Sequence, residues 1–177
     1  MPVTIPVHPT RPVIKYRGVV DFHNLLRTLR QAIIDQGYTF YESGHEYKMG
    51  ENGAELKISW EGTRKISGFL RYSLHIFIFA REYRDIDFVK DGQKIVLQQT
   101  RMLIEFQGTL DLDYNRTFEK SKLLLAVREF LLNYVWRKKV TGTWGDDLYY
   151  TIYKLHRIAK ECLNMESITD SSRYRVL

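Results

Sequence analysis

Two pairs of aspartates come closest, in residue type and spacing, to a catalytic arrangement. Asp85 and Asp87 are separated by one residue, and so are Asp111 and Asp113. In a β-strand this spacing puts both carboxylates of a pair on one face, about 7 Å apart, where they could bind magnesium or transfer protons. Neither pair has a third carboxylate or a base at a fixed spacing. We therefore interpret both as the acidic face of a sheet or the lining of a polar lumen, and we predict no catalytic residues and no enzyme.

The other residues that could do chemistry predict neither a metal site nor a cofactor. The five histidines form no i,i+4 pair, and the sequence has no paired cysteines, no glycine-rich phosphate loop and no G-x-S-x-G motif. Cys162 is the single cysteine and falls on the apolar side of an expected helix. We interpret it as a structural thiol and not as a nucleophile.

A basic cluster indicates a different chemistry, which is contact with phosphate. Arg137, Lys138 and Lys139 are consecutive, aromatic residues make up 14% of the chain, and the formal net charge is +6. Nucleic-acid-binding proteins combine cations and aromatic side chains in this way. Most of the aromatic residues here fall at positions typical of a hydrophobic core, so nucleic acid is a possible partner rather than the leading one.

Periodicity predicts one amphipathic helix followed by a long run of antiparallel strands. Val13–Val20 is rich in β-branched residues, which favour a strand. The apolar residues of Phe22–Gln36 recur at helical spacing. From Tyr38 to Tyr114 apolar and polar residues mostly alternate, as they do in strands with one wet face. Phe69–Ala80 is apolar on both faces, so we expect a central strand with helices on one side and another covering on the other.

Turn residues and two further helices complete the expected domain. Lys90-Asp91-Gly92-Gln93 has the residues of a two-residue hairpin, and Gly108 interrupts a strand, which indicates a bulge or a close backbone approach. Phe118–Trp136 and a helix from Asp146 or Asp147 to Leu163 are both expected to pack on the sheet. The predicted fold class is α+β: an antiparallel sheet of about five to seven strands, one N-terminal amphipathic helix and two C-terminal helices.

The two ends of the chain differ from the predicted single domain over residues 13–165. Residues 1–12 hold all four prolines and should be extended, and residues 166–177 form a polar tail. Both are interpreted as arms that contact neighbouring subunits in an assembly. The apolar residues that would make these contacts are Val3, Ile5, Val7, Tyr174, Val176 and Leu177.

Length and composition limit the remaining possibilities. A chain of 177 residues with 44% hydrophobic and 27% charged residues is typical of one globular domain. No apolar run approaches the roughly 20 residues that a membrane-spanning helix needs, and the first residues lack the pattern of a signal peptide. We therefore expect no membrane partner, no secretion through a signal peptide, and a location in a virion or in the cytoplasm.

Several short segments, mostly turns and helix starts, resemble a known but uncharacterised group of proteins. They are Tyr16–Phe22, Leu25–Gln36, Gly37-Tyr38, Phe40–Glu42, Val89–Gly92, Asp113-Tyr114, Phe118–Lys122, Asp147–Tyr150 and Leu155-His156. This pattern, between Tyr16 and Met165, resembles an uncharacterised family of small α+β proteins from archaeal and viral environmental genomes. The resemblance implies an α+β fold, and because the family has no assigned function it implies no site residues.

Three hypotheses for function follow. The first is a non-enzymatic structural subunit of a larger assembly, a virion component such as a tail tube, neck or baseplate, which would be a homo-oligomer or join other subunits. The second is a START-like domain that encloses a small molecule or lipid between a curved sheet and a long C-terminal helix. The third is a nucleic-acid-binding protein with phosphate contacts at Arg137–Lys139.

Overall fold

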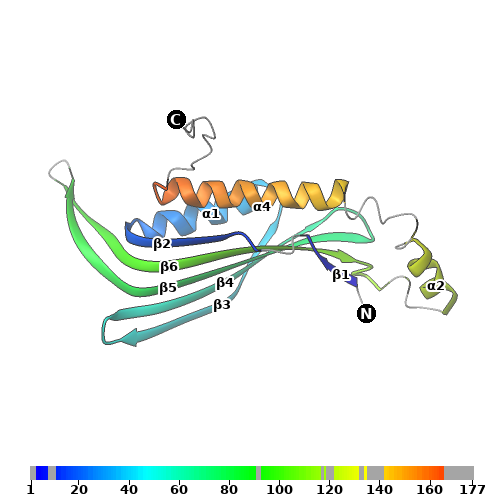
Figure 1. The fold of residues 1–177 in the computed structure, drawn as a ribbon, viewed down its shortest axis with the longest axis horizontal. Helices are drawn as coiled ribbons and strands as arrows, with labels where there is room; N and C mark the ends of the chain where they lie inside the picture. Colours follow the sequence, from blue (N-terminus) through cyan, green and yellow to red (C-terminus); the bar gives the residue numbers. More distant parts are fainter. Residues whose placement is uncertain are drawn as a thin grey trace, which may run out of the picture.

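The fold is α+β, with helices on one face of a curved antiparallel sheet. The computed structural model describes residues 3–7, 11–90, 93–116, 118, 122–131, 134 and 142–165. These residues form a six-stranded sheet and three helices. Figure 1 shows α1 and α4 side by side along one face of the sheet, whereas α2 lies beyond one end of it. The expected α+β class and strand number are therefore confirmed.

The last strand is the centre of the topology, because it pairs with three other strands. The strand order is β1-β6-β5-β4-β3, and β2 also pairs with β6. One edge of β6 pairs with β5, and the other pairs with β2 and then with β1. The strands are β1 (Val3–Pro6), β2 (Val13–Val20), β3 (Thr39–Gly50), β4 (Gly53–Lys65), β5 (Leu70–Lys90) and β6 (Gln93–Leu112).

Two strand predictions are confirmed in the long β5–β6 ribbon. The segment expected to be a central strand lies within β5, which has β4 on one side and β6 on the other. β5 ends at Lys90 and β6 begins at Gln93, and these two residues pair with each other. This register requires the two-residue connection that the sequence indicated, although the two connecting residues themselves lie outside the described part.

Helix α1 (Phe22–Asp35) follows the predicted pattern closely but not its predicted place in the fold. The side chain of Asp21 caps the helix by accepting a hydrogen bond from the backbone N–H of Asn24, and the apolar face of the helix is buried. Two strands of the sheet precede it. The description of one N-terminal helix and two C-terminal helices is therefore wrong, because α1 is inserted between strands β2 and β3.

Helix α4 (Thr143–Cys162) packs closely on β6 at Gly108. A Cβ atom on Gly108 would lie only 2.6 Å from Ile152 Cδ1 and 3.0 Å from Leu148 Cγ. Both of those α4 residues are fully buried in the core. The glycine therefore allows the helix backbone to approach the strand, and the predicted close approach is confirmed. The helix also begins earlier than expected, so that Trp144 lies in it and not in a loop.

Helix α2 (Lys122–Phe130) corrects the prediction for residues 118–136. The sequence favoured a long helix with a core stripe along the sheet, whereas the α-helix found among the described residues of this segment spans Lys122–Phe130. Val127 is 39% exposed, and Tyr134, expected in the same core stripe, is 76% exposed. Helical periodicity was correct here, but the apolar side does not face the sheet, because α2 lies beyond the end of it (Figure 1).

The N-terminal segment is extended, as predicted, but part of it belongs to the sheet. Val3–Pro6 forms strand β1 and pairs with residues 109–112 of β6. Val3, Ile5 and Val7 pack against the hydrophobic core of their own chain. These contacts account for the apolar residues of the segment without a neighbouring subunit.

Candidate binding face

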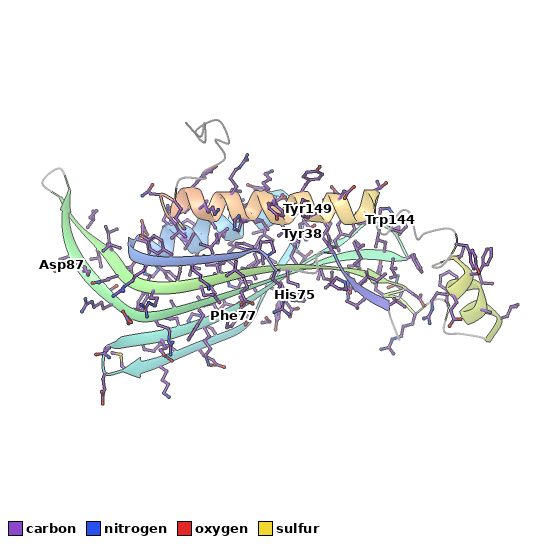
Figure 2. All side chains as sticks on the ribbon, viewed as in Figure 1. Tyr38, His75, Phe77, Asp87, Trp144 and Tyr149 are labelled. Atoms are coloured by element: carbon purple, nitrogen blue, oxygen red, sulfur yellow. The ribbon has the colours of Figure 1, made fainter. Side chains whose placement is uncertain are left out.

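One face of the sheet is left uncovered by every described element. Along β5, Leu74, Ile76 and Ile78 point toward the helices and are buried. The alternate residues point the other way; Phe77 and Phe79 among them are partly exposed. Their rings are nearly parallel, at 23°, with centroids 6.4 Å apart. Figure 2 shows His75 and Phe77 on the side of the sheet opposite α4. The second covering that the sequence predicted for this strand is not found among the described residues.

Three arginines form a row across this open face. Arg17 of β2 lies opposite Arg101 of β6, and Arg101 lies opposite Arg81 of β5. Neighbouring strands are about 4.8 Å apart, so the three side chains leave the same face in sequence. Like charges that face each other directly across strands destabilise a sheet. Repulsion among the three arginines therefore destabilises the sheet, and the fold itself does not require arginine at these positions.

A hollow of ≈440 Å³ lies beside the arginine row. We call it the cationic hollow. Its residues are Lys15, Tyr16, Arg17, Phe79, Arg81, Arg101, Met102 and Leu103. The register places Lys15 opposite Leu103, and Leu103 opposite Phe79. The hollow therefore has an apolar floor from two strands, a rim of four cations, and no carboxylate among its lining residues.

The four cations of the hollow are not equally neutralised. Arg81 Nε lies 3.1 Å from Glu55 Oε1, and the Arg81 guanidinium lies over the Phe79 ring at 5.3 Å. Arg101 is 3.8 Å from a carboxylate oxygen of Glu82. Within the described residues, Lys15 and Arg17 have no carboxylate at ion-pair distance. Positive charge is therefore in excess on the β2 side of the hollow.

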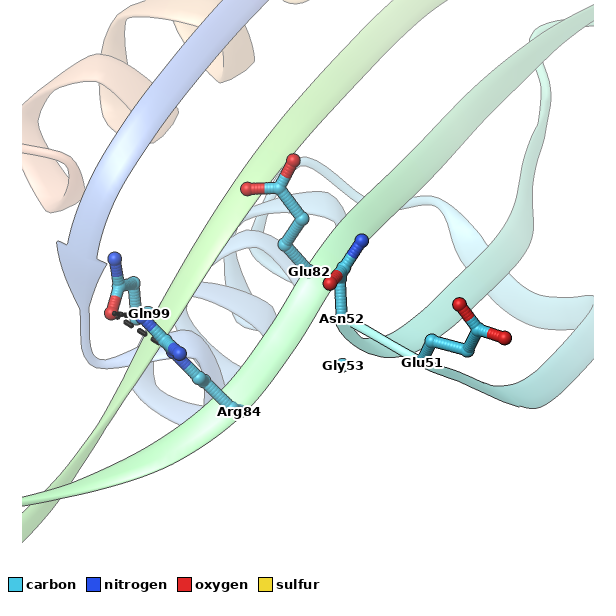
Figure 3. Close-up of a pocket in the computed structure, with 6 residues that line it drawn as sticks. All are labelled: Glu51, Asn52, Gly53, Glu82, Arg84 and Gln99. Atoms are coloured by element: carbon cyan, nitrogen blue, oxygen red, sulfur yellow. Dashed lines mark hydrogen bonds between the residues drawn. The ribbon is translucent and has the colours of Figure 1, made fainter.

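The hollow shown in Figure 3 differs in its charge. It measures ≈600 Å³ and lies where the β3–β4 turn meets an irregularity in β5. Arg84 donates two hydrogen bonds to Gln99 Oε1, at 3.0 and 2.7 Å, and Glu51 and Glu82 also line the space. A Cβ atom on Gly53 would lie 2.9 Å from the backbone of Glu82, so this turn requires glycine. Because both signs of charge line it, this hollow has no clear preference for an anion or a cation.

Asp111 and Asp113 do not form the acidic face that the sequence predicted. The Asp111 carboxylate is buried and accepts hydrogen bonds from Thr4, Arg71 and Ser73. Asp113 is fully buried at the end of β6, with Arg128 of α2 at 3.6 Å. Both carboxylates are neutralised by their own chain and hold elements together.

The other acidic pair lies toward the far end of the β5–β6 ribbon. Asp85 and Asp87 are exposed, and Asp85 accepts a hydrogen bond from Gln98 Nε2 at 3.0 Å. The side-chain oxygen of Gln98 in turn accepts from the backbone N–H of Phe22, at the start of α1. Asp85 pairs near one end of β6 and Asp111 lies near the other, so the structure does not bring the two pairs together.

The geometry of the described residues supports neither a metal site nor a reactive thiol nor a membrane-spanning helix. In the part of the chain that the structure describes, no three His, Cys, Asp or Glu side chains gather in a way that could hold a metal ion. Cys162 is half-buried, and burial raises the pKa of its thiol, which disfavours the reactive thiolate. None of the helices in those residues has both the length and the apolar character needed to span a membrane.

Some of the predicted site residues lie outside the described part of the chain, and the arginine row on the open face was not predicted from the sequence. Arg137, Lys138 and Lys139, together with Tyr174, Val176 and Leu177, lie outside the described residues. The arginine row was not predicted, because it depends on the register between three strands. Lys15 and Arg17 do alternate with core residues in the sequence, which was the one available sign that they share a face.

The chain was also compared with known proteins. No family model matches it, and no curated protein matches its sequence. The resemblance to an uncharacterised α+β family therefore stays a prediction, and the functional argument rests on the geometry of the molecule.

Proposed function

We propose that the protein is a non-enzymatic subunit of a larger assembly and that α2 makes the contact with a neighbouring subunit. The observation that supports this proposal is an apolar stripe on α2 that faces away from the body of its own chain. We call it the α2 stripe. It consists of Leu123, Val127 and Phe130 of the helix, together with the exposed Tyr134 that follows it.

The residues of the α2 stripe are exposed. Leu123 is 75% exposed and Phe130 57% exposed. Within the helix Leu123, Val127 and Phe130 are spaced by four and three positions, which places helical residues on one side and matches the seam along which two helices pair. The ring of Tyr134 stacks on that of Phe130, with centroids 5.2 Å apart. Fully burying a Leu, Val or Phe side chain is worth about 1.5–3 kcal/mol, so covering the stripe would stabilise a contact substantially.

The opposite side of α2 is fixed to the body. Arg128 is almost buried, with 12% of its side chain exposed, and lies 3.6 Å from the fully buried Asp113. Asp113 Oδ1 also accepts a hydrogen bond from the backbone N–H of Phe118, whose ring meets that of Phe69 edge-on. These contacts hold α2 in a defined orientation and leave the stripe facing outward. A second copy of the same helix would offer a matching seam.

A virion component such as a tail tube, neck or baseplate remains the assembly that we propose from the sequence. The C-terminal contacts at Tyr174, Val176 and Leu177 stay part of that proposal. The N-terminal contacts are replaced by the α2 stripe, since Val3, Ile5 and Val7 already pack on their own core. The START-like alternative gains no support, because the hollows found among the described residues are open and buried side chains fill the layer between sheet and helices.

The proposal is tested by measuring mass in solution across a range of protein concentrations. The double substitution Leu123→Gln and Phe130→Gln should yield a monomer under conditions where the wild-type chain forms oligomers. The matched control carries Met49→Gln and Tyr150→Gln, which remove two equally exposed apolar side chains, 74% and 71% exposed, from other elements. The control should still assemble. A monomeric wild-type chain at high concentration, or a stripe variant that still assembles, would refute the proposal.

A further inference from the structure

We propose that the cationic hollow binds single-stranded nucleic acid, with phosphates on Lys15, Arg17 and Arg101 and a base against Phe79 and Leu103. This site is separate from the α2 stripe and from the basic cluster at Arg137–Lys139. It goes beyond the proposed assembly role, since neither activity requires the other.

The charges around the cationic hollow favour an anionic partner. Arg17, Arg101 and Arg81 face one another across three strands, which is unfavourable unless an anion lies between or above them. Lys15 adds a fourth cation at the rim. The carboxylates nearest to this row, Glu55 and Glu82, are already engaged with Arg81 and Arg101. An anionic partner would complement the excess charge that remains.

The cationic hollow differs from the other hollows in the charge of its lining. Four other hollows among the described residues, including the one in Figure 3, are each lined by at least one carboxylate: Glu51 and Glu82, Glu61 and Glu105, Glu51 with Glu55 and Glu82, or Asp146. Only cations and uncharged residues line the cationic hollow. Electrostatics therefore favour an anion at this place on the open face more than at the other hollows.

The apolar floor of the hollow indicates what kind of anion fits. A bare phosphate would use the cations but not the apolar surface of Phe79 and Leu103. Nucleotides present a flat base beside each phosphate, and bases stack on aromatic side chains of an open sheet. Phe77 extends the aromatic surface beyond Phe79, with the two rings nearly parallel. A row of cations about 10 Å wide by strand spacing can contact more than one phosphate, which favours a strand over a mononucleotide.

A single strand fits better than a duplex. In a duplex the bases are already stacked and paired, so only phosphates would reach the hollow. An unpaired strand can turn a base onto the apolar floor while its backbone follows the arginine row. The site is therefore expected to prefer unpaired nucleic acid and to have little sequence preference, because every base has a flat apolar face.

The experiment uses the full chain and a fluorescently labelled 15-nucleotide oligothymidylate, followed by fluorescence anisotropy over a series of salt concentrations. We expect binding that weakens steeply with salt and is stronger for the single strand than for a duplex of equal length. The double substitution Arg17→Gln and Arg101→Gln should reduce the slope of log affinity against log salt by about 0.7 for each lost phosphate contact. Phe79→Leu should weaken binding about tenfold with little change in that slope.

The matched control is Lys154→Gln with Arg157→Gln, which removes the same charge from the exposed side of α4. It should bind the oligonucleotide like the wild-type chain. Equal loss in both double variants would show attraction to overall charge and would refute the site. Absence of binding at low salt would refute it as well. Binding of anionic phospholipid vesicles without binding of the oligonucleotide would assign the hollow to a lipid surface and overturn the proposal. A monomeric wild-type chain that binds the oligonucleotide would support this site while refuting only the assembly.

Discussion

Gly108 allows a sharp prediction about how the helices are held on the sheet. Gly108→Ala places a Cβ atom 2.6 Å from Ile152 Cδ1, 3.0 Å from Leu148 Cγ and 3.1 Å from Leu148 Cδ2. The Ile152 atom is the flexible end of a side chain and can turn away. The Leu148 Cγ atom is a branch point inside the core, so it can move only if α4 shifts or the side chain changes rotamer.

The expected cost follows from these contacts. Overpacking a core by one methyl group costs about 1–3 kcal/mol, and the Leu148 contacts put this site near the middle of that range. We therefore expect Gly108→Ala to lower the free energy of unfolding by about 2 kcal/mol. For a chain of this length that corresponds to a fall in Tm of about 4–8 °C.

Urea unfolding and thermal melting of four variants (Gly108→Ala, Gly44→Ala, Ile152→Val and the double variant Gly108→Ala with Ile152→Val) test the prediction. Gly44→Ala is the matched control in β3, because its Cβ would lie 3.6 Å from Ser59 Cβ, an ordinary contact; it should change stability little. Adding Ile152→Val to Gly108→Ala removes the closest clashing atom, so the double variant should lose less stability than the sum of the two single variants. A neutral Gly108→Ala, or strict additivity in the double variant, would refute the close-approach reasoning.

Two further predictions concern buried polar groups. Asp111→Asn should destabilise the protein by about 2–3 kcal/mol in urea unfolding, because a neutral amide has no charge to pair with Arg71 and offers one acceptor oxygen where the carboxylate uses both. Amide exchange of Val3, Thr4 and Ile5 should rise too, since the contact between Thr4 and Asp111 is weakened. A variant with wild-type stability would contradict this role. Burial raises the pKa of Tyr38 to about 12, so its phenol stays neutral in the folded chain while the unfolded chain releases the proton near pH 10. Stability should therefore fall between about pH 10 and pH 12, and Tyr38→Phe should reduce that fall in urea unfolding measured across this pH range.

Local signals in the sequence predicted those parts of the fold that depend on neighbouring residues. The α1 pattern was correct to within one residue, because a capping aspartate and an apolar face act over a few turns. Gly108 was recognised as a close approach because an isolated glycine within a strand weakens it and is typical of a bulge or a tight contact. The related contact at Gly62, where a Cβ would lie 3.1 Å from Ile33 of α1, was not singled out, because nothing local says which strand lies under which helix.

Features that depend on distant residues could not be predicted. The apolar residues of α2 repeat like those of a core helix, and periodicity alone does not say what covers them. The arginine row requires the register of β2, β6 and β5 together. Asp111 was expected on a wet face because its sequence neighbours alternate, but Arg71, forty positions away, neutralises it. In each of these cases the environment of the residue is determined by segments that lie far from it in the sequence.

The pairing of the first strands with the last one also determines when the domain can fold. Val13 pairs with Glu105, and Val3 pairs with Leu112. A growing chain therefore contains β1 and β2 long before their partner strand is synthesised, and contacts so distant in sequence form slowly. Until β6 is complete, the apolar residues of the N-terminal strands and the inner edge of β5 have no partner and are exposed to aggregation. Once β6 is made, the sheet is complete and α4 has the surface on which it packs, so folding of this domain is expected to be a cooperative event that waits for β6.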